Sequence, residues 1–178
     1  MIYIILFVVG VIAMAAVNIS MEKQEKEKSS NVFKNLKNFK ISMKPLITKE
    51  SSIAIDKTNK QLCLVTNNNA KIFNFSDLIM SELIINNEVK STSKVGRAIV
   101  GGILLGGVGA IVGATTGKDK EKVKSIILKL TFNNLSNSTY KMNFLDMEVK
   151  KDGFLYNDAI KQAEKWENMM NVILNQNK

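Results

Sequence analysis

The spacing of the glycines is the most informative pattern in this sequence, because it indicates which surfaces can pack closely together. Eight of its ten glycines lie in one apolar segment, residues 96–117, which carries no charge between Arg97 and Lys118. Two sets of these glycines recur at intervals of four residues: Gly102 with Gly106, and Gly109 with Gly113 and Gly117. On a helix this interval leaves a groove without side chains on one face, so that a second helix can pack closely against it.

The same segment predicts contact with a membrane or with another protein chain. Two apolar side chains, Ile111 and Val112, stand between the later glycines and are suited to lipid. Basic residues flank the segment on both sides: Lys90, Lys94 and Arg97 before it, and Lys118, Lys120, Lys122 and Lys124 after it. Each basic residue near an anionic membrane surface contributes about 1 kcal/mol to binding. The alternative is that these charges are solvated near a turn and partly neutralised by Asp119 and Glu121.

A helical hairpin is the expected form of residues 96–117. Strand-like sequence stands on both sides of this segment, and a single membrane crossing would divide one sheet between the two sides of the bilayer. A bend near Gly106 and Gly107 avoids that division. Each arm of about ten residues would rise roughly 15 Å, about half a bilayer. Two readings stay open: the hairpin contacts a membrane or a second copy of the chain, or it packs within its own domain.

The residues that usually carry catalysis are scarce. The chain has no histidine and one cysteine, Cys63, which excludes Ser-His-Asp and Cys-His catalysis, histidine-based metal sites and thiolate clusters. The run from Gly113 to Asp119 ends in Gly-Lys-Asp and lacks the P-loop pattern. Asp56 and Asp146 stand at turns or strand ends. We therefore predict a protein that is not an enzyme and binds no cofactor and no metal.

A second apolar run, residues 1–17, contains no charged side chain. A membrane-spanning helix needs at least about 17 residues, so this run is just long enough. Lysines follow the run rather than precede it, which favours an uncleaved anchor with the body of the chain on the cytoplasmic side of the cell membrane. The alternative is a cleaved signal peptide, because Ala13, Met14 and Ala15 have the small-x-small form of a cleavage site.

The net charge of +9 favours anionic partners. Nucleic acid is not expected, since few aromatic residues stand beside the basic ones and no stacking platform is visible. The anionic inner leaflet of the membrane fits better. Residues 18–40 form a basic linker, either a plain connection or a helix lying on the bilayer surface. Four apolar residues in it have the spacing of a short amphipathic helix: Val32, Phe33, Leu36 and Phe39.

Alternating apolar residues predict about six or seven antiparallel strands in the rest of the chain. The expected strands lie near residues 52–55, 61–66, 71–75, 78–85, 125–132 and 140–144, with a turn at 67–69. One amphipathic helix follows, capped by Asn157 or Asp158. Its apolar residues should cover an open end or face of the sheet: Ala159, Ile160, Ala163, Trp166, Met170, Ile173 and Leu174.

This order of elements resembles the pleckstrin-homology-like (PH-like) fold. More narrowly, residues 50–175 are similar to a group of largely uncharacterised bacterial and phage proteins. The similarity rests on Ile53-x-x-Asp56 followed by Leu62, on the turn from Phe73 to Leu78, and on the glycine pattern from Gly96 to Gly113. The resemblance implies a mainly β sandwich or barrel with a C-terminal helix, interrupted by an apolar hairpin. It supplies no activity.

The chain is therefore expected to comprise an anchor (1–17), a basic linker (18–40) and a PH-like domain (41–178) with an inserted glycine-rich hairpin (96–117). We predict a non-enzymatic binding module held at the inner face of the cytoplasmic membrane, with a lipid or a protein as its partner. The alternative is a membrane effector or phage exclusion protein that forms homo-oligomers through its glycine hairpins.

Overall fold

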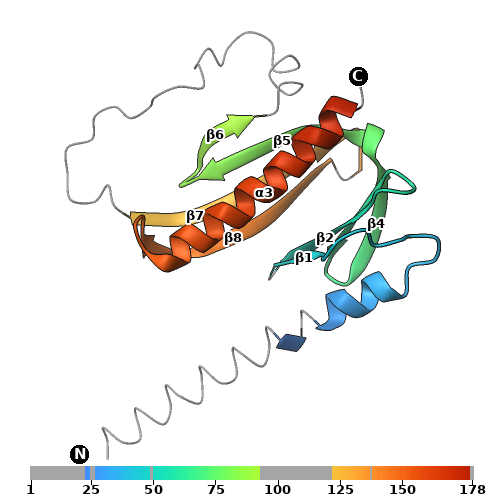
Figure 1. The fold of residues 1–178 in the computed structure, drawn as a ribbon, viewed down its shortest axis with the longest axis horizontal. Coiled ribbons are helices and arrows are strands. Elements are labelled where there is room, and N and C mark those ends of the chain that lie inside the picture. The colour runs from blue at the N-terminus through green and yellow to red at the C-terminus, as the bar shows by residue number, and fades with distance from the viewer. Residues whose placement is uncertain (1–22, 25–26, 49, 93–121, 137, 177–178) are drawn as a thin grey trace, which may run out of the picture.

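Two antiparallel sheets of four strands and one long C-terminal helix make up most of the described part of the computed structural model (Figure 1). The structure describes residues 23–24, 27–48, 50–92, 122–136 and 138–176. The first sheet has the strand order β1-β2-β3-β4 and the second has the order β6-β5-β7-β8. The elements are β1 (Leu46–Ile47), β2 (Ser51–Asp56), β3 (Gln61–Thr66), β4 (Asn69–Asn74), the 3-10 turn η1 (Phe75–Asp77), β5 (Leu78–Ile85), β6 (Glu88–Thr92), β7 (Lys122–Phe132), β8 (Thr139–Lys150) and α3 (Phe154–Gln176). The predicted mainly β architecture with a C-terminal helix is confirmed.

The first sheet is a series of hairpins, and two asparagines form the turn between β3 and β4. Strands β2 and β3 pair without interruption from Ser51 opposite Thr66 to Asp56 opposite Gln61. Between β3 and β4 the two turn residues, Asn67 and Asn68, have φ of 49° and 61°. A two-residue hairpin turn of this kind needs positive φ at both positions, which asparagine tolerates. The predicted turn is confirmed, although its third expected residue already begins β4.

In the second sheet β5 is paired on both sides. It pairs with β6, where Glu82 faces Thr92, and with β7, where Glu82 faces Lys129. The two strands that flank residues 93–121 in sequence therefore lie on either side of β5, and the inference that they belong to one sheet is confirmed. The apolar pattern does not predict β1, which has two residues, or β6, which is a short polar strand at the sheet edge.

The core lies between the inner faces of the two sheets. Alternate residues of β7 point into it, and Ile126, Leu128, Leu130 and Phe132 are all buried. Phe132 stacks on Phe73 of the first sheet, with the two ring centroids 4.3 Å apart. Burial of such apolar side chains is the main driving force for joining the two sheets.

Helix α3 closes this core, as its apolar stripe predicts. Its second half, with Trp166, Met170, Ile173 and Leu174, packs into the cluster shared by both sheets. Its first half, with Ala159 and Ala163, packs on the second sheet alone.

The expected start of the helix at Asn157 or Asp158 is wrong, because α3 begins at Phe154. A tight turn sets this start: the Gly153 amide donates to the Lys150 carbonyl at 3.0 Å, and the Asn157 amide donates to the Gly153 carbonyl at 3.1 Å.

The segment just before β1 covers the outer face of the first sheet. Residues 27–34 are helical, and Phe33 and Phe39 are buried against the outward-facing Ala54, Cys63 and Val65. Strand β2 is therefore buried on both of its faces. The sequence leaves two roles open for the four apolar residues between 32 and 39: a plain connection, or a helix on the bilayer surface. Neither role includes the packing on the first sheet that the structure shows.

Asp56 ties this N-terminal segment to the sheet. Its buried carboxylate accepts the Lys40 amide at 2.7 Å, the Asn59 amide at 2.9 Å and the Asn59 side-chain amide at 2.8 Å. Burial by itself raises the pKa of this carboxyl, but the hydrogen bonds outweigh it and hold the pKa below the ordinary 3.8. The sequence predicts that Asp56 acts in a turn, and these hydrogen bonds identify the groups that it holds there.

No helix in the described ranges is long and apolar enough to cross a bilayer. The predicted anchor at residues 1–17 and the predicted hairpin at 96–117 lie outside the described residues.

Replacing Trp166 tests the core role of α3. Trp166→Ala should lower the free energy of unfolding by about 3–5 kcal/mol, because a large buried aromatic side chain leaves a cavity. Val172→Ala is the control, since Val172 lies on the same helix and is exposed. Urea unfolding followed by circular dichroism measures both. Equal midpoints for the two variants would place Trp166 outside the core.

Replacing Asp56 tests the buried carboxylate. Because its folded-state pKa lies below the unfolded value, its stabilising effect is full above about pH 5 and is lost as the pH falls through the folded pKa. Asp56→Asn should therefore cost about 1–3 kcal/mol at pH 7, with the deficit shrinking on acidification toward pH 2. Asp152→Asn, at an exposed turn position, is the control. A deficit that does not depend on pH would contradict the role of the charge.

Candidate functional site

The candidate site is the place where the chain leaves the second sheet after Thr92 and returns to it at Lys122, which we call the insert root. All the glycines of the predicted contact face lie outside the described residues, as do Ile111, Val112, Lys94, Arg97, Lys118 and Lys120. Three of the seven predicted collar residues are described: Lys90, Lys122 and Lys124. Their surroundings define what the root can do.

Each of these three lysines has a carboxylate partner. Lys122 and Lys124 share Glu148 of β8, at 2.7 and 3.5 Å, and Lys90 lies 2.5 Å from Glu88. The hydrogen bond from Lys122 holds the pKa of Glu148 below its usual value, and Lys90 does the same for Glu88. Such exposed pairs contribute little to stability. They do reduce the positive charge that the three lysines present at the root.

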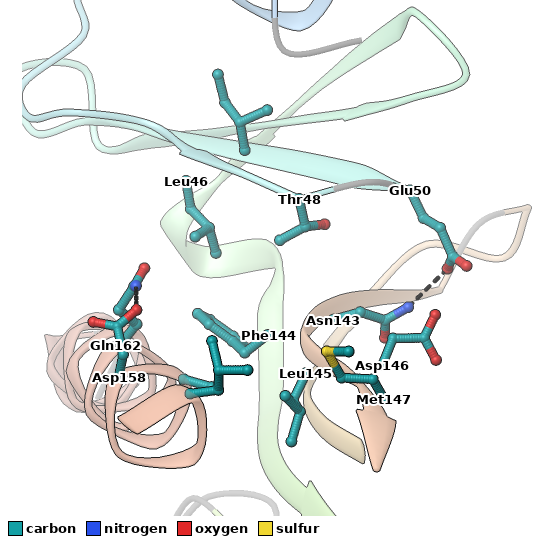
Figure 2. A pocket seen from close by; sticks show the side chains of 13 residues that line it. Leu46, Thr48, Glu50, Asn143, Phe144, Leu145, Asp146, Met147, Asp158 and Gln162 are labelled. Atoms are coloured by element: carbon teal, nitrogen blue, oxygen red, sulfur yellow. Dashed lines mark hydrogen bonds between the residues drawn. The ribbon is translucent and has the colours of Figure 1, made fainter. Parts of the chain in front are cut away.

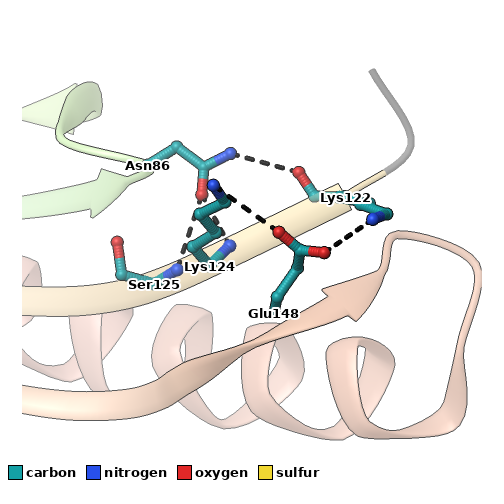
Figure 3. Close-up of polar contacts among 5 residues, drawn as sticks. All are labelled: Asn86, Lys122, Lys124, Ser125 and Glu148. Atoms are coloured by element: carbon teal, nitrogen blue, oxygen red, sulfur yellow. Dashed lines mark hydrogen bonds and ion pairs between the residues drawn. The ribbon is translucent and has the colours of Figure 1, made fainter. Parts of the chain in front are cut away.

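Asn86 is hydrogen-bonded through its side chain to the start of β7, where the chain returns to the sheet (Figure 3). It lies in the two-residue turn between β5 and β6, with φ of 51°. Its side-chain oxygen accepts the amides of Lys124 at 2.8 Å and Ser125 at 3.4 Å, and its side-chain nitrogen donates to the Lys122 carbonyl at 3.3 Å. Pairing of β7 with β5 starts only at Ile126, so Asn86 serves backbone groups that β5 does not reach.

Neither Asn86 nor Glu148 is among the residues predicted for the site. The signal for Asn86 is present in the sequence, since two successive asparagines between two strand-like runs indicate a tight hairpin. The hydrogen bonds from the Asn86 side chain to β7, which we call the clasp, cannot be predicted from the sequence, because residues 87–121 separate Asn86 from Lys122. Glu148 is likewise 26 residues from Lys122, and only the pairing of β7 with β8 brings them together.

The two ends of the insert root are well separated along the sheet. Thr92 faces Glu82, which faces Lys129 on β7. From Lys129 to Lys122 the strand runs seven residues, or roughly 20 Å. The chain therefore leaves from the middle of one sheet edge and returns at the end of the sheet.

Apolar side chains are exposed at that same end of the sheet. Lys122 faces Lys150, the last residue of β8, and the turn into α3 follows directly (Figure 1). Phe154 is 82% exposed and Leu155 is 54% exposed. Lysines beside uncovered large apolar side chains are the combination found where proteins meet a membrane surface.

At the other end of the root, β6 is held to α3. The Ser91 hydroxyl donates to the Glu167 carboxylate, which is almost fully buried. Burial raises the pKa of Glu167, the bond from Ser91 opposes the rise, and the nearby Glu164 adds to it. The strand that leads into residues 93–121 is thus connected to the helix that closes the core.

The described residues offer little for catalysis. They contain no group of three or more histidine, cysteine or acidic side chains that could hold a metal ion. Burial raises the pKa of the Cys63 thiol to about 12, so this thiol stays protonated and unreactive at neutral pH.

Two antiparallel sheets closed by a C-terminal helix define a PH-like domain. The sequence profile of the family described as "Glycine zipper containing PH domain" matches residues 37–146, more than half of the chain. The chain therefore belongs to this family of glycine zipper-containing PH domains, and the predicted resemblance is confirmed.

Two relatives are similar over 111 residues, each at 32% identity and covering 56% of this chain. One is named "Immunity protein" and comes from Bacillus phage SPbeta, with 55% of its length covered. The other is the SPbeta prophage-derived uncharacterized membrane protein YomJ of Bacillus subtilis strain 168, with 49% of its length covered. The chain thus spans about half the length of these relatives. No solved structure matches it.

Replacing Asn86 tests the clasp on β7. Asn86→Gly keeps the positive φ and removes the side-chain bonds, which should cost about 1 kcal/mol. Asn86→Ala adds the strain of a left-handed residue, about 1–2 kcal/mol more. Amide exchange at Lys124 and Ser125 should quicken in both variants.

The control for the clasp is Asn87→Gly. Asn87 also has positive φ, at 65°, and no bond from its side chain to β7 is present among the described residues. This variant should leave exchange at Lys124 unchanged. If all three variants behave alike, the turn geometry matters and the clasp does not.

Proposed function

We propose that this chain is a non-enzymatic, membrane-associated PH-like binding module. Residues 1–17 anchor it as a single-pass protein, and its body lies at the inner face of the cytoplasmic membrane. Residues 96–117 form a glycine-rich hairpin that enters the bilayer or packs against a partner. The module binds a lipid or a protein and performs no reaction of its own.

The observation that carries this proposal is the pairing of β5 with both β6 and β7. Residues 93–121 leave from and return to one sheet. If they met lipid as a single crossing, that sheet would be divided by the bilayer. A hairpin keeps the sandwich on one side, and within helices its backbone groups satisfy each other, as a lipid environment requires.

The surface beside the insert root supports the membrane reading. Phe154 and Leu155 are exposed next to Lys150 and Lys151, at the end of the sheet where the chain returns. Interfacial segments combine apolar side chains with lysines in this way. That one relative is named a membrane protein agrees with the same reading.

A second candidate is an oligomerising membrane effector or phage exclusion protein. A relative named "Immunity protein" from a phage favours it. In that case the glycines at intervals of four, Gly109, Gly113 and Gly117, would pack hairpins of several copies against each other. Oligomeric state in detergent separates the candidates, since a binding module is monomeric and an effector forms a discrete cluster.

Two pairs of substitutions test the hairpin in a fragment of residues 18–178. Replacing Ile111 and Val112 by Asp should abolish flotation with anionic liposomes, because a carboxylate at membrane depth costs several kcal/mol. Replacing Gly109 and Gly113 by Leu should instead block close packing of helices and dissolve oligomers. The fluorescence of Trp166, the one tryptophan, reports whether each variant is folded.

The control for the Asp pair changes two exposed apolar residues far from the root. Ile72 is 43% exposed on β4, and Leu135 is fully exposed beyond the other end of β7. Replacing both by Asp should leave flotation unchanged. A fragment that stays monomeric, never floats and ignores both hairpin pairs would show that residues 96–117 pack within the domain, and the proposal for this segment would fall.

A further inference from the structure

A groove opens between the two sheets (Figure 2). It lies at β8, which is the edge strand opposite β6 in the second sheet. Its volume is about 420 Å³, and its walls come from β1, β8 and the first half of α3. It lies apart from the lysines of the insert root, although Leu155, which is exposed near that root, also lines the groove. Its charged lining residues are all acidic, whereas the chain as a whole is basic.

The groove runs along two strand edges rather than across a sheet face. Five consecutive residues of β8, from Asn143 to Met147, line it, and so do three consecutive residues, Leu46 to Thr48, at β1. Successive side chains of a regular strand point to opposite faces, and the pairing of β8 with β7 shifts register twice along this stretch, so the unbroken run of lining residues fits an irregular strand edge. Both β1 and β8 are the outer strands of their sheets.

The groove is closed at one end and along one side. At the closed end the Ser51 hydroxyl donates to the Lys141 carbonyl at 2.6 Å, and the Asn143 side-chain amide donates to Glu50 at 2.9 Å. Along the side stand Leu155, Asp158, Ala159 and Gln162, which share one face of α3 because helical residues three and four apart are neighbours. Beyond Lys141 the outer edge of β8 is paired with no described residue.

The floor of the groove is apolar and its rim is acidic. Leu46, Phe144 and Leu145 are on the floor side, whereas every charged side chain that lines the groove is a carboxylate: Glu50, Asp146 and Asp158. The chain as a whole has a net charge of +9, so the charge at the groove is opposite in sign to the net charge. In addition, the side-chain oxygen of Asn143 is buried there without a hydrogen-bond partner among the described residues.

We propose that this groove binds an extended, basic peptide segment of another protein, which adds as a strand to the free edge of β8. Main-chain bonds to the edge supply the pairing. Alternate apolar side chains of the segment enter the floor, and its lysines or arginines face the three carboxylates. Anionic lipid and nucleic acid are disfavoured at this place, because the same carboxylates repel them.

The test uses the full 178-residue chain in a non-ionic detergent and a displayed library of random nine-residue peptides. Enriched peptides should alternate apolar residues with lysine or arginine and lack internal proline. Their binding should weaken as salt rises, since rim charges are screened. Amide exchange at residues 144–148 should slow when such a peptide binds.

Charge reversal at the rim provides the matched comparison. Replacing Asp146 and Asp158 by Lys should weaken binding about tenfold or more, because like charges then face each other. Replacing Asp152 and Glu164 by Lys changes the net charge equally on the neighbouring turn and on α3, outside the groove, and should leave affinity unchanged. Trp166 fluorescence confirms that both variants are folded.

Three results overturn the proposal. The first is a library that yields no enriched peptide, or only acidic or proline-rich ones. The second is binding that survives reversal at Asp146 and Asp158, or that falls equally in the control variant. The third is a chain that self-associates in detergent and separates on that reversal, since the occupant would then be a second copy of this chain.

Discussion

The pairing of β5 with strands on both sides is the constraint on which the rest of the structure depends. Since β6 and β7 bracket residues 93–121 in sequence and β5 in space, the second sheet closes across a long insertion. The ladder holds both ends of the insertion to one rigid surface, and the side chain of Asn86 extends that hold past the last paired residue of β7. The inner face of this sheet then supplies half of the core that α3 closes. The domain can therefore carry a glycine-rich insertion without giving up its sandwich.

Charge in this protein is organised locally rather than by its net value. The chain carries +9 overall, yet the described lysines at the insert root are paired with Glu148 and Glu88, and the groove beside β8 is lined by carboxylates alone. At physiological salt, exposed charges more than about 8 Å apart are largely screened from each other, so an approaching molecule is attracted or repelled by these local patches rather than by the net charge. The basic, partly apolar end of the sheet and the acidic groove are therefore two chemically different surfaces on one small domain.

The apolar patterns were sufficient for most of the secondary structure. The alternation at Ile126, Leu128, Leu130 and Phe132 and the helical spacing from Ala159 to Leu174 correspond to the core observed. The apolar patterns did not predict elements whose positions are not set by burial of apolar side chains. Strand β6 is polar because it is an exposed edge, and α3 starts a turn early because of the geometry at Gly153. The residues of the candidate site were predicted by type near the glycine segment, but Asn86 and Glu148 act from elsewhere in the chain.

By itself the sequence determined that this is a mainly β domain with a glycine-rich insertion, one closing helix and no histidine chemistry. Those properties depend on residue types and on periodicities of two and 3.6, which are local. Only the tertiary structure decided that the segment around Phe33 covers the first sheet, that Glu148 pairs with both Lys122 and Lys124, and that β1, β8 and α3 form an acidic groove. Each of these requires segments far apart in the chain to meet. Their meeting is set by strand register and side-chain packing, which no local pattern encodes.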